Sequence, residues 1–203
     1  MVSILSIDFD YFLNVSSEER DVYFPKGSEE IPKDNIALMW EERYKQYPEL
    51  KKVGVINDYY LLKNYLLTQN LNKENFYKSD THTDIKNLVH KIPRDKQLYI
   101  VNVDFHHDYY HYFKGKDNYN CGNWLRRLVE ERPDTKVKWI RRNDSQLFSL
   151  EGMFPFEHTI DIKSIFKEKF DYVFICKSPE WSPPHLNGKY EELSHFLSKG
   201  KIA

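Results

Sequence analysis

The stretch Leu98-Tyr99-Ile100-Val101-Asn102-Val103-Asp104-Phe105-His106-His107-Asp108 decides how this chain is interpreted. Its apolar half predicts a buried β-strand, and its polar end has the pattern D-x-H-x-D. Side chains at i, i+2 and i+4 of an extended chain share one face, so we expect Asp104, His106 and Asp108 to project together, about 7 Å apart from one to the next. At the end of a buried strand such a group would be costly without a compensating cation. The alternatives are a polar strand end in solvent and a satisfied ion-pair network.

A second strand with an acidic end begins the chain. Residues 2–8 predict a buried strand, and Asp8 and Asp10 form the pattern D-x-D at its end. A buried Asp is uncommon unless it is paired or binds a metal. Two such strand ends in a chain of this size predict a single shared centre.

A third element supplies another imidazole. His82 precedes the D-x-H-x-D strand by one helix and a short turn, and it would complete a set of four Asp and two His. The segment Asp80-x-His82-x-Asp84 is itself a D-x-H-x-D and an alternative centre. We rank it second because residues 75–78 are a poor buried strand and Asp84 suits the first turn of a helix.

The composition limits the function classes. A chain of 203 residues predicts one domain, residues 1–203. With 30 basic and 31 acidic residues it has no global charge that favours nucleic acid or an anionic membrane. Cys121 and Cys176 are far apart and belong to no C-x-x-C, which predicts neither a disulfide framework nor a cysteine zinc site and fits a reducing cytoplasm. We expect no signal peptide and no membrane span.

The pattern along the chain predicts an α/β fold with a mostly parallel sheet. In such a sheet the ligand site lies beyond the carboxyl ends of the strands, where both acid motifs occur. The expected strands are residues 2–8, 97–104, 136–141 (an edge strand) and 170–176, the expected helices are residues 35–47, 58–68, 84–91, 122–132, 163–169 and 188–198, and long loops are expected at residues 14–34 and 109–120.

Together, His82, the D-x-H-x-D of residues 104–108 and the D-x-D of residues 8–10 resemble the ureohydrolase superfamily, which contains arginases, agmatinases and, more distantly, histone deacetylases. This implies a three-layer α/β/α fold. In common arginases the D-x-D strand follows the D-x-H-x-D strand, so the order here implies a circular permutation. The blocks IDFDYF, DFHHD, GNWL and SPEWSPP resemble a small branch that includes peptide arginases, which convert arginine side chains in ribosomal peptides to ornithine.

The resemblance implies two Mn²⁺ ions per chain that activate water for attack on a guanidinium carbon. Oxygen-rich ligands with imidazole suit Mn²⁺ better than a thiolate site would. Asp104 and Asp8 would bridge the ions. One ion would also have His82 and Asp108, the other His106 and Asp10, and Asp108 would orient the attacking water.

Substrate and proton-transfer groups are further candidates. Glu180, in the SPEW turn, would bind the guanidinium as a bidentate partner, or it is a surface Glu in a proline-rich turn. His107 and His111 would transfer protons to the leaving amine, although His107 points away from His106 on an extended strand, which favours a structural role. Asn123, in a Cys-Gly-Asn run that is similar to the family's S-G-N loop, would bind substrate backbone or cap the next helix.

The sequence therefore predicts a dinuclear manganese hydrolase whose partner is an arginine-containing peptide and whose products are ornithine and urea. Three alternatives remain open. They are a free arginine or agmatine hydrolase, a metal-dependent amide hydrolase of the deacetylase kind, and a catalytically silent metal-binding protein.

Overall fold

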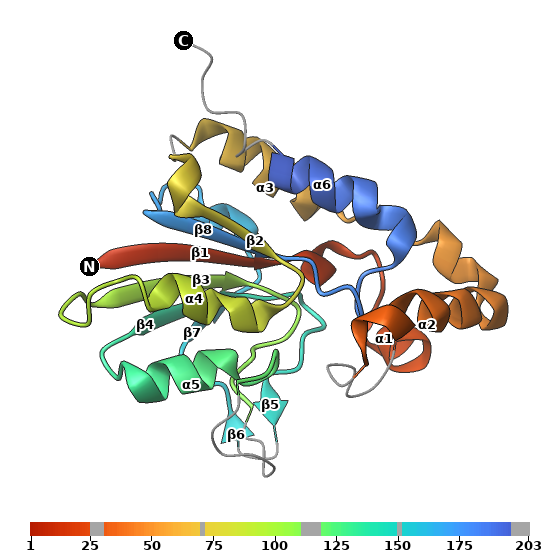
Figure 1. Cartoon of the computed structure of the whole chain (residues 1–203), viewed down its shortest axis with the longest axis horizontal. Helices are drawn as coiled ribbons and strands as arrows, with labels where there is room; N and C mark the ends of the chain where they lie inside the picture. Colours follow the sequence, from red (N-terminus) through yellow and green to blue (C-terminus); the bar gives the residue numbers. More distant parts are fainter. Residues whose placement is uncertain (25–30, 70–71, 111–118, 150–151, 196–203) are drawn as a thin grey trace.

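The computed structural model describes residues 1–24, 31–69, 72–110, 119–149 and 152–195. Its centre is a six-stranded sheet of order β2-β8-β1-β3-β4-β7, in which every pairing is parallel (Figure 1). A short antiparallel hairpin, β5-β6, stands apart from it. The strands are β1 (Val2–Asp8), β2 (Phe76–Ser79), β3 (Leu98–Val103), β4 (Lys136–Ile140), β5 (Phe148–Ser149), β6 (Gly152–Met153), β7 (Glu157–Thr159) and β8 (Tyr172–Cys176).

Helices cover both faces of the sheet, as parallel strands require for their crossover connections. Helices α3 and α6 lie over one face, α4 and α5 over the other, and α1 and α2 lie beyond the carboxyl end of β1 (Figure 1). The helices are α1 (Ser17–Tyr23), α2 (Lys33–Gln46), α3 (Asn57–Thr68), α4 (Ile85–Val89), α5 (Trp124–Glu131) and α6 (Asn187–His195), with short 3₁₀ turns that include η1 (Phe9–Phe12), η5 (His82–Asp84) and η6 (Ile162–Ile165).

Alternation along the strands divides the core into two apolar layers. Leu5 and Ile7 of β1 belong to the layer that contains Leu62 of α3, whereas Ile4 belongs to the layer that contains Leu88 of α4 and Leu125 of α5. Successive side chains of a strand point to opposite faces, so one central strand serves both layers. The predicted α/β architecture, with helices on both faces of a parallel sheet, is confirmed.

One expectation about the sheet edges is wrong, and one edge strand was not expected. Residues 75–78, which we judged a poor buried strand, overlap β2, which lies half exposed at one edge, where a strand needs no continuous apolar run. The predicted edge strand 136–141 is β4, and it pairs with both β3 and β7. Its alternating lysines misled us, because Lys138 is buried and forms ion pairs with Glu157 and Glu168.

The predicted loop of residues 14–34 contains helix α1. Ser16 accepts a hydrogen bond from the backbone N–H of Glu19, and the Glu19 carboxylate accepts one from the backbone N–H of Ser16. This capping box, the S-x-x-E pattern, is a helix start signal that the sequence did contain. Helix α1 brings Arg20 and Asp21 to the carboxyl end of the sheet.

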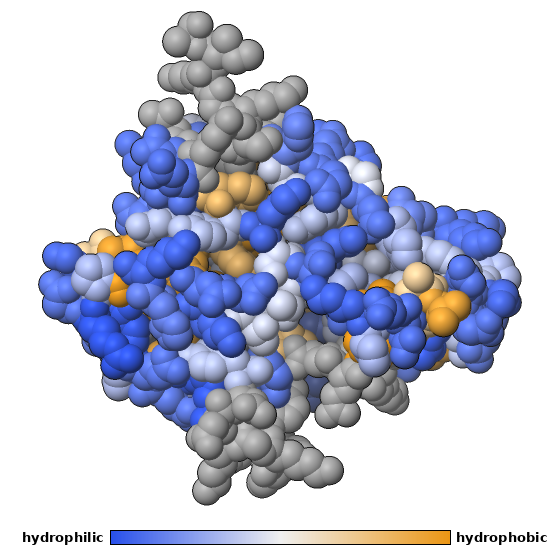
Figure 2. All heavy atoms as spheres, in the orientation of Figure 1, coloured by the Kyte–Doolittle hydropathy of each residue, from blue (hydrophilic) through white to orange (hydrophobic). Residues whose placement is uncertain are grey.

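The surface in Figure 2 is mostly hydrophilic, with hydrophobic side chains in small separate patches. This agrees with a chain in which 30% of the residues are charged. No helix among the described residues is long and apolar enough to cross a membrane.

Candidate metal centre

Both acid motifs leave the sheet through the same local turn. Asp8 ends β1, and its Oδ1 accepts the backbone N–H of Asp10 at 3.2 Å. Asp104 follows β3, and its Oδ1 accepts the backbone N–H of His106 at 2.9 Å. When the carboxylate of an Asp accepts a hydrogen bond from the backbone N–H two residues later, the chain bends into an Asx-turn.

The extended D-x-H-x-D that we expected is therefore wrong in its geometry. The strand ends at Val103, and Asp108 has φ 52°, in the left-handed region. The expected convergence of the two strand ends nevertheless occurs, because β1 and β3 are neighbours and Ile7 pairs with Val103. The turns, and not a shared strand face, bring the acids together.

His82 lies at the middle of the first group of potential ligands. Its Nδ1 lies 3.3 Å from an Oδ2 atom of each of Asp8, Asp104 and Asp108. The His82 side chain is fully buried, and this nitrogen has no hydrogen-bond partner among the described residues. One nitrogen cannot satisfy three carboxylate oxygens, whereas a cation between the four atoms can.

Neighbouring side chains fix this first group in place. Ser6 of β1 holds the other imidazole nitrogen, with Oγ 2.7 Å from Nε2 of His82. The imidazole stacks between Trp124 and Phe174, with ring centroids 4.7 and 5.7 Å away. Trp124 Nε1 also donates to Oδ2 of Asp108 at 2.5 Å. A ligand whose second nitrogen and ring faces are held in this way has a fixed orientation.

A second group lies on the other side of Asp104. His106 Nδ1 is 3.5 Å from Oδ2 of Asp10 and 4.0 Å from Oδ1 of Asp104. Oδ1 of Asp10 is buried without a hydrogen-bond partner in the described chain. Asp104 thus presents Oδ2 to the first group and Oδ1 to the second, and this arrangement can bring two cations close together.

Arg20 occupies part of this second group. Its Nη1 lies 3.0 Å from Oδ2 of Asp10, its Nη2 donates to the backbone oxygen of Asp10, and its guanidinium lies over the Phe105 ring at 3.9 Å. Both side chains of the ion pair are buried. Sequence reasoning missed Arg20 because it lies within the segment predicted as a loop.

Cys176, at the end of β8, lies beside the first group. Its Sγ lies within the same small cluster as ligand atoms of Asp8 and His82, and Ser178 Oγ lies 3.2 Å from it. Burial, and then the charge of Asp8, raise the pKa of the Cys176 thiol well above its usual value. A thiol that keeps its proton is a poor ligand, so the donor set remains oxygen and imidazole.

The segment that follows β8 also holds the Asp8 carboxylate in place. Ser178, which follows β8, donates from Oγ to Oδ2 of Asp8 at 2.6 Å and has φ 46°, a left-handed backbone for a residue other than glycine. The sequence showed only a turn-rich segment here, so this support was not predicted.

The pKa values of His82 and Asp108 in the first group are shifted by burial and by the neighbouring carboxylates. Burial by itself lowers the pKa of His82, but interactions with Asp104 and Asp8 outweigh it and raise that pKa to about 9. Burial, and then the charge of Asp104, raise the pKa of Asp108 well above its usual range. Without a cation, protons therefore supply the compensating charge at neutral pH.

The residues fit divalent cations. The two groups offer carboxylate oxygens and imidazole nitrogens, which hard and borderline divalent metals accept. Ligand atoms about 2.1 Å from one ion lie roughly 3.0–3.5 Å apart, and the contacts of His82 Nδ1 have this spacing. All six predicted ligand residues lie in the two groups, although the structure places Asp8 with the first group only.

The alternative D-x-H-x-D does not form a centre. Asp80 is half exposed and lies 3.6 Å from Lys33, and Asp84 accepts a hydrogen bond from Ser79 Oγ at 2.5 Å. Only His82 of that motif joins the cluster. The preference for Asp104, His106 and Asp108 agrees with this arrangement.

The predicted proton-transfer and substrate-binding residues that the structure describes are not ligands of either group. His107 packs among Tyr110, Trp139 and Phe154, away from the ligand groups, and accepts the backbone N–H of Tyr109. Asn123 is buried, and its Oδ1 accepts the backbone N–H of Asn120 rather than capping α5. His111 lies outside the described residues.

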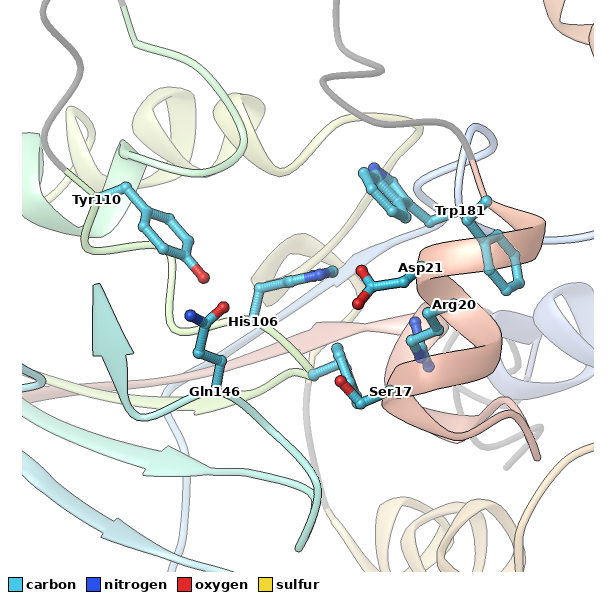
Figure 3. A pocket seen from close by; sticks show the side chains of 9 residues that line it. Ser17, Arg20, Asp21, His106, Tyr110, Gln146 and Trp181 are labelled. Atoms are coloured by element: carbon cyan, nitrogen blue, oxygen red, sulfur yellow. The ribbon is translucent and has the colours of Figure 1, made fainter. Parts of the chain in front are cut away.

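Glu180 lines a pocket that opens beside the first group. The pocket has a volume of about 390 Å³, and its lining includes His82, Ser178 and Trp181. A second pocket of about 140 Å³, which also includes Trp181, opens beside His106 (Figure 3). Trp181 therefore lines two hollows, each of which reaches one ligand group, a role that the sequence did not indicate.

Comparison of the chain with protein-family models, with curated proteins and with solved structures found no match. The geometry of the two ligand groups is therefore the basis on which a function is inferred.

Proposed function

We propose that this protein is a metal-dependent hydrolase that releases urea from an arginine side chain of a peptide and leaves ornithine. The observation that carries the proposal is the position of His82 Nδ1, buried and 3.3 Å from three carboxylates, beside a second Asp-His group that shares Asp104. Two groups joined through one carboxylate favour a two-ion site for Mn²⁺.

Bound divalent cations would supply a water whose pKa is low enough for attack at neutral pH. Asp108, one of whose oxygens is fixed by the Trp124 indole N–H, would orient the attacking water and accept its proton. His82, with Ser6 behind it, keeps its Nδ1 aimed at the centre. Asp8, held by Ser178, and Asp104, held by its Asx-turn, stay in place throughout.

The proposal that the chain is a permuted ureohydrolase has support from the sheet. The D-x-D strand comes first in sequence, yet it is paired side by side with the D-x-H-x-D strand. Because all strands of the six-stranded sheet are parallel, the ligands meet at one edge whatever the order of the strands along the chain. Both cysteines are free thiols, which agrees with action in a reducing cytoplasm.

A peptide substrate is favoured by the two hollows that Trp181 lines. Together they give room beside the centre for more than one side chain, and the lining includes aromatic and polar groups. Free arginine or agmatine would need only one compact pocket with groups for its own ends.

The second candidate is a one-ion amide hydrolase. The Arg20–Asp10 ion pair favours it, because Arg20 already neutralises one carboxylate of the second group. The amount of metal bound per chain and the product distinguish the two candidates. Urea release from an arginine peptide with Mn²⁺, absent after chelation, supports the first, and acetate release from an acetyl-lysine peptide with one ion per chain supports the second.

A further inference from the structure

The pocket beside His106 has one wall made by helix α1. Its lining includes Ser17, Asp21, His106, Gln146 and Trp181. Figure 3 shows the Asp21 carboxylate pointing toward the His106 imidazole, with the indole of Trp181 beside them. At about 140 Å³ the hollow is much smaller than the one that Glu180 lines.

The charges around this pocket leave one carboxylate uncompensated. Arg20 is also in the lining, but its guanidinium is bonded to Asp10 and stacked on Phe105. Asp21, the next residue along α1, has no ion pair or hydrogen bond within the described chain. With the Arg20–Asp10 pair neutral overall, the pocket carries the single negative charge of Asp21 and suits a monovalent cation.

The aromatic side chains in the lining of this pocket favour a planar cation as its ligand. Trp181 stacks with Phe24, with ring centroids 6.3 Å apart, and meets His106 edge to face at 5.3 Å. A guanidinium binds a carboxylate through parallel N–H groups and stacks on an aromatic face, and both partners are present here. The amide of Gln146 and the hydroxyl of Ser17 add hydrogen-bonding groups.

We propose that Asp21, with Trp181, binds the guanidinium of the substrate arginine and determines specificity for it. This inference rests on the proposed function and replaces Glu180 in that role. The pocket of Glu180 holds the Lys33–Asp80 ion pair in its lining, and at about 390 Å³ it has room for the remainder of a peptide rather than for a guanidinium alone.

The test compares three variants of the full chain. Asp21→Asn removes the charge with little change in shape, Glu180→Gln removes the rival acid, and Glu18→Gln removes an exposed charge from the same helix outside the pocket lining. Calorimetric titration without added metal measures binding of N-acetyl-arginine amide and of its neutral citrulline counterpart. The KM and kcat of the Mn²⁺-loaded chain for an arginine peptide are measured in parallel.

We expect Asp21→Asn to weaken binding of the arginine probe about tenfold or more and to raise KM with a smaller change in kcat. Glu18→Gln should match the unchanged chain, and the citrulline probe should bind poorly to all. Unchanged binding in Asp21→Asn overturns the proposal, and loss confined to Glu180→Gln reassigns the guanidinium to that residue. The titration needs no turnover, so it gives its answer even if no urea forms and the proposed function fails.

Discussion

Arg20 Nη1 lies 3.0 Å from Oδ2 of Asp10, and both side chains are buried at the edge of the second ligand group. The two groups of the centre are therefore unequal. The acids of the first group face His82, whose positive charge is a proton that a metal ion can displace, whereas Asp10 has a permanent counter-charge from Arg20. We infer that cations bind the first group more tightly than the second.

Arg20→Met tests whether the Arg20–Asp10 ion pair weakens cation binding by the second group. The variant leaves a buried carboxylate unpaired, so the metal-free chain should lose about 3–5 kcal/mol of unfolding free energy. Asp10 should then bind Mn²⁺ more strongly, so saturating Mn²⁺ should raise Tm by more than it does in the unchanged chain. Thermal unfolding with and without Mn²⁺ measures both. Arg20→Lys, which keeps the charge, is the control, and an unchanged Mn²⁺-induced rise in Arg20→Met would contradict the inference.

Asp104→Asn tests the sharing of one carboxylate between the groups. Because Oδ2 faces His82 and Oδ1 faces the second group, the amide should weaken both sites. Elemental analysis should find about two Mn²⁺ per unchanged chain and far less in the variant. Asp134→Asn, on an exposed turn, should keep both ions. Full occupancy in Asp104→Asn would show that the site is assigned wrongly.

The metal-free chain should become less stable as the pH rises. The pKa of His82 is about 9 in the folded chain against 6.5 ordinarily, so its protonated form stabilises the fold below pH 6.5 and this contribution is lost as the pH rises through 9. The raised pKa of Asp108 acts in the same direction. Tm measured from pH 6 to pH 9.5 should fall without metal and fall less with Mn²⁺, because the cation replaces the proton. His82→Gln should reduce the slope, and an equal slope in that variant would refute the assignment.

Asp80 and Asp108 separate the two D-x-H-x-D motifs. Asp80 is half exposed and pairs with Lys33, so Asp80→Asn should keep both Mn²⁺ ions and most of the turnover. Asp108→Asn should lower kcat by about 10²–10⁴-fold, since it removes the proposed proton acceptor. Initial rates of urea release on one peptide compare them. Loss of turnover in Asp80→Asn with retention in Asp108→Asn would reverse the assignment.

The sequence predicted the fold where local patterns determined it. Continuous apolar runs predicted β1, β3 and β8, because strands covered on both faces need apolar side chains on both. The D-x-D at the end of β1 and the D-x-H-x-D at the end of β3 predicted which side chains meet. Edge strands β2 and β7 are short and half exposed, so their sequences carry little of this signal.

Much of the site depends on contacts between distant residues, which no local pattern encodes. Arg20 reaches Asp10 from a separate helix, Ser178 reaches Asp8 across the sheet, and Trp124 reaches Asp108 from the start of α5. The Asx-turns that aim Asp8 and Asp104 inward were not predicted either, since alternation alone is equally consistent with an extended strand. The capping box before α1 was a local signal, and it indicated the helix that carries Arg20 and Asp21.

Hydrolysis of a peptide arginine is measured by a mass-spectrometric time course of an arginine-containing peptide incubated with the Mn²⁺-loaded chain. Free arginine at equal concentration is the comparison. Adding water and losing urea lowers the peptide mass by about 42 Da per arginine. We predict that this species accumulates with Mn²⁺, is absent after chelation and in Asp108→Asn, and forms faster than ornithine from free arginine. An unchanged peptide mass with a fully loaded chain would contradict the account, and faster turnover of free arginine would contradict the assignment of a peptide substrate.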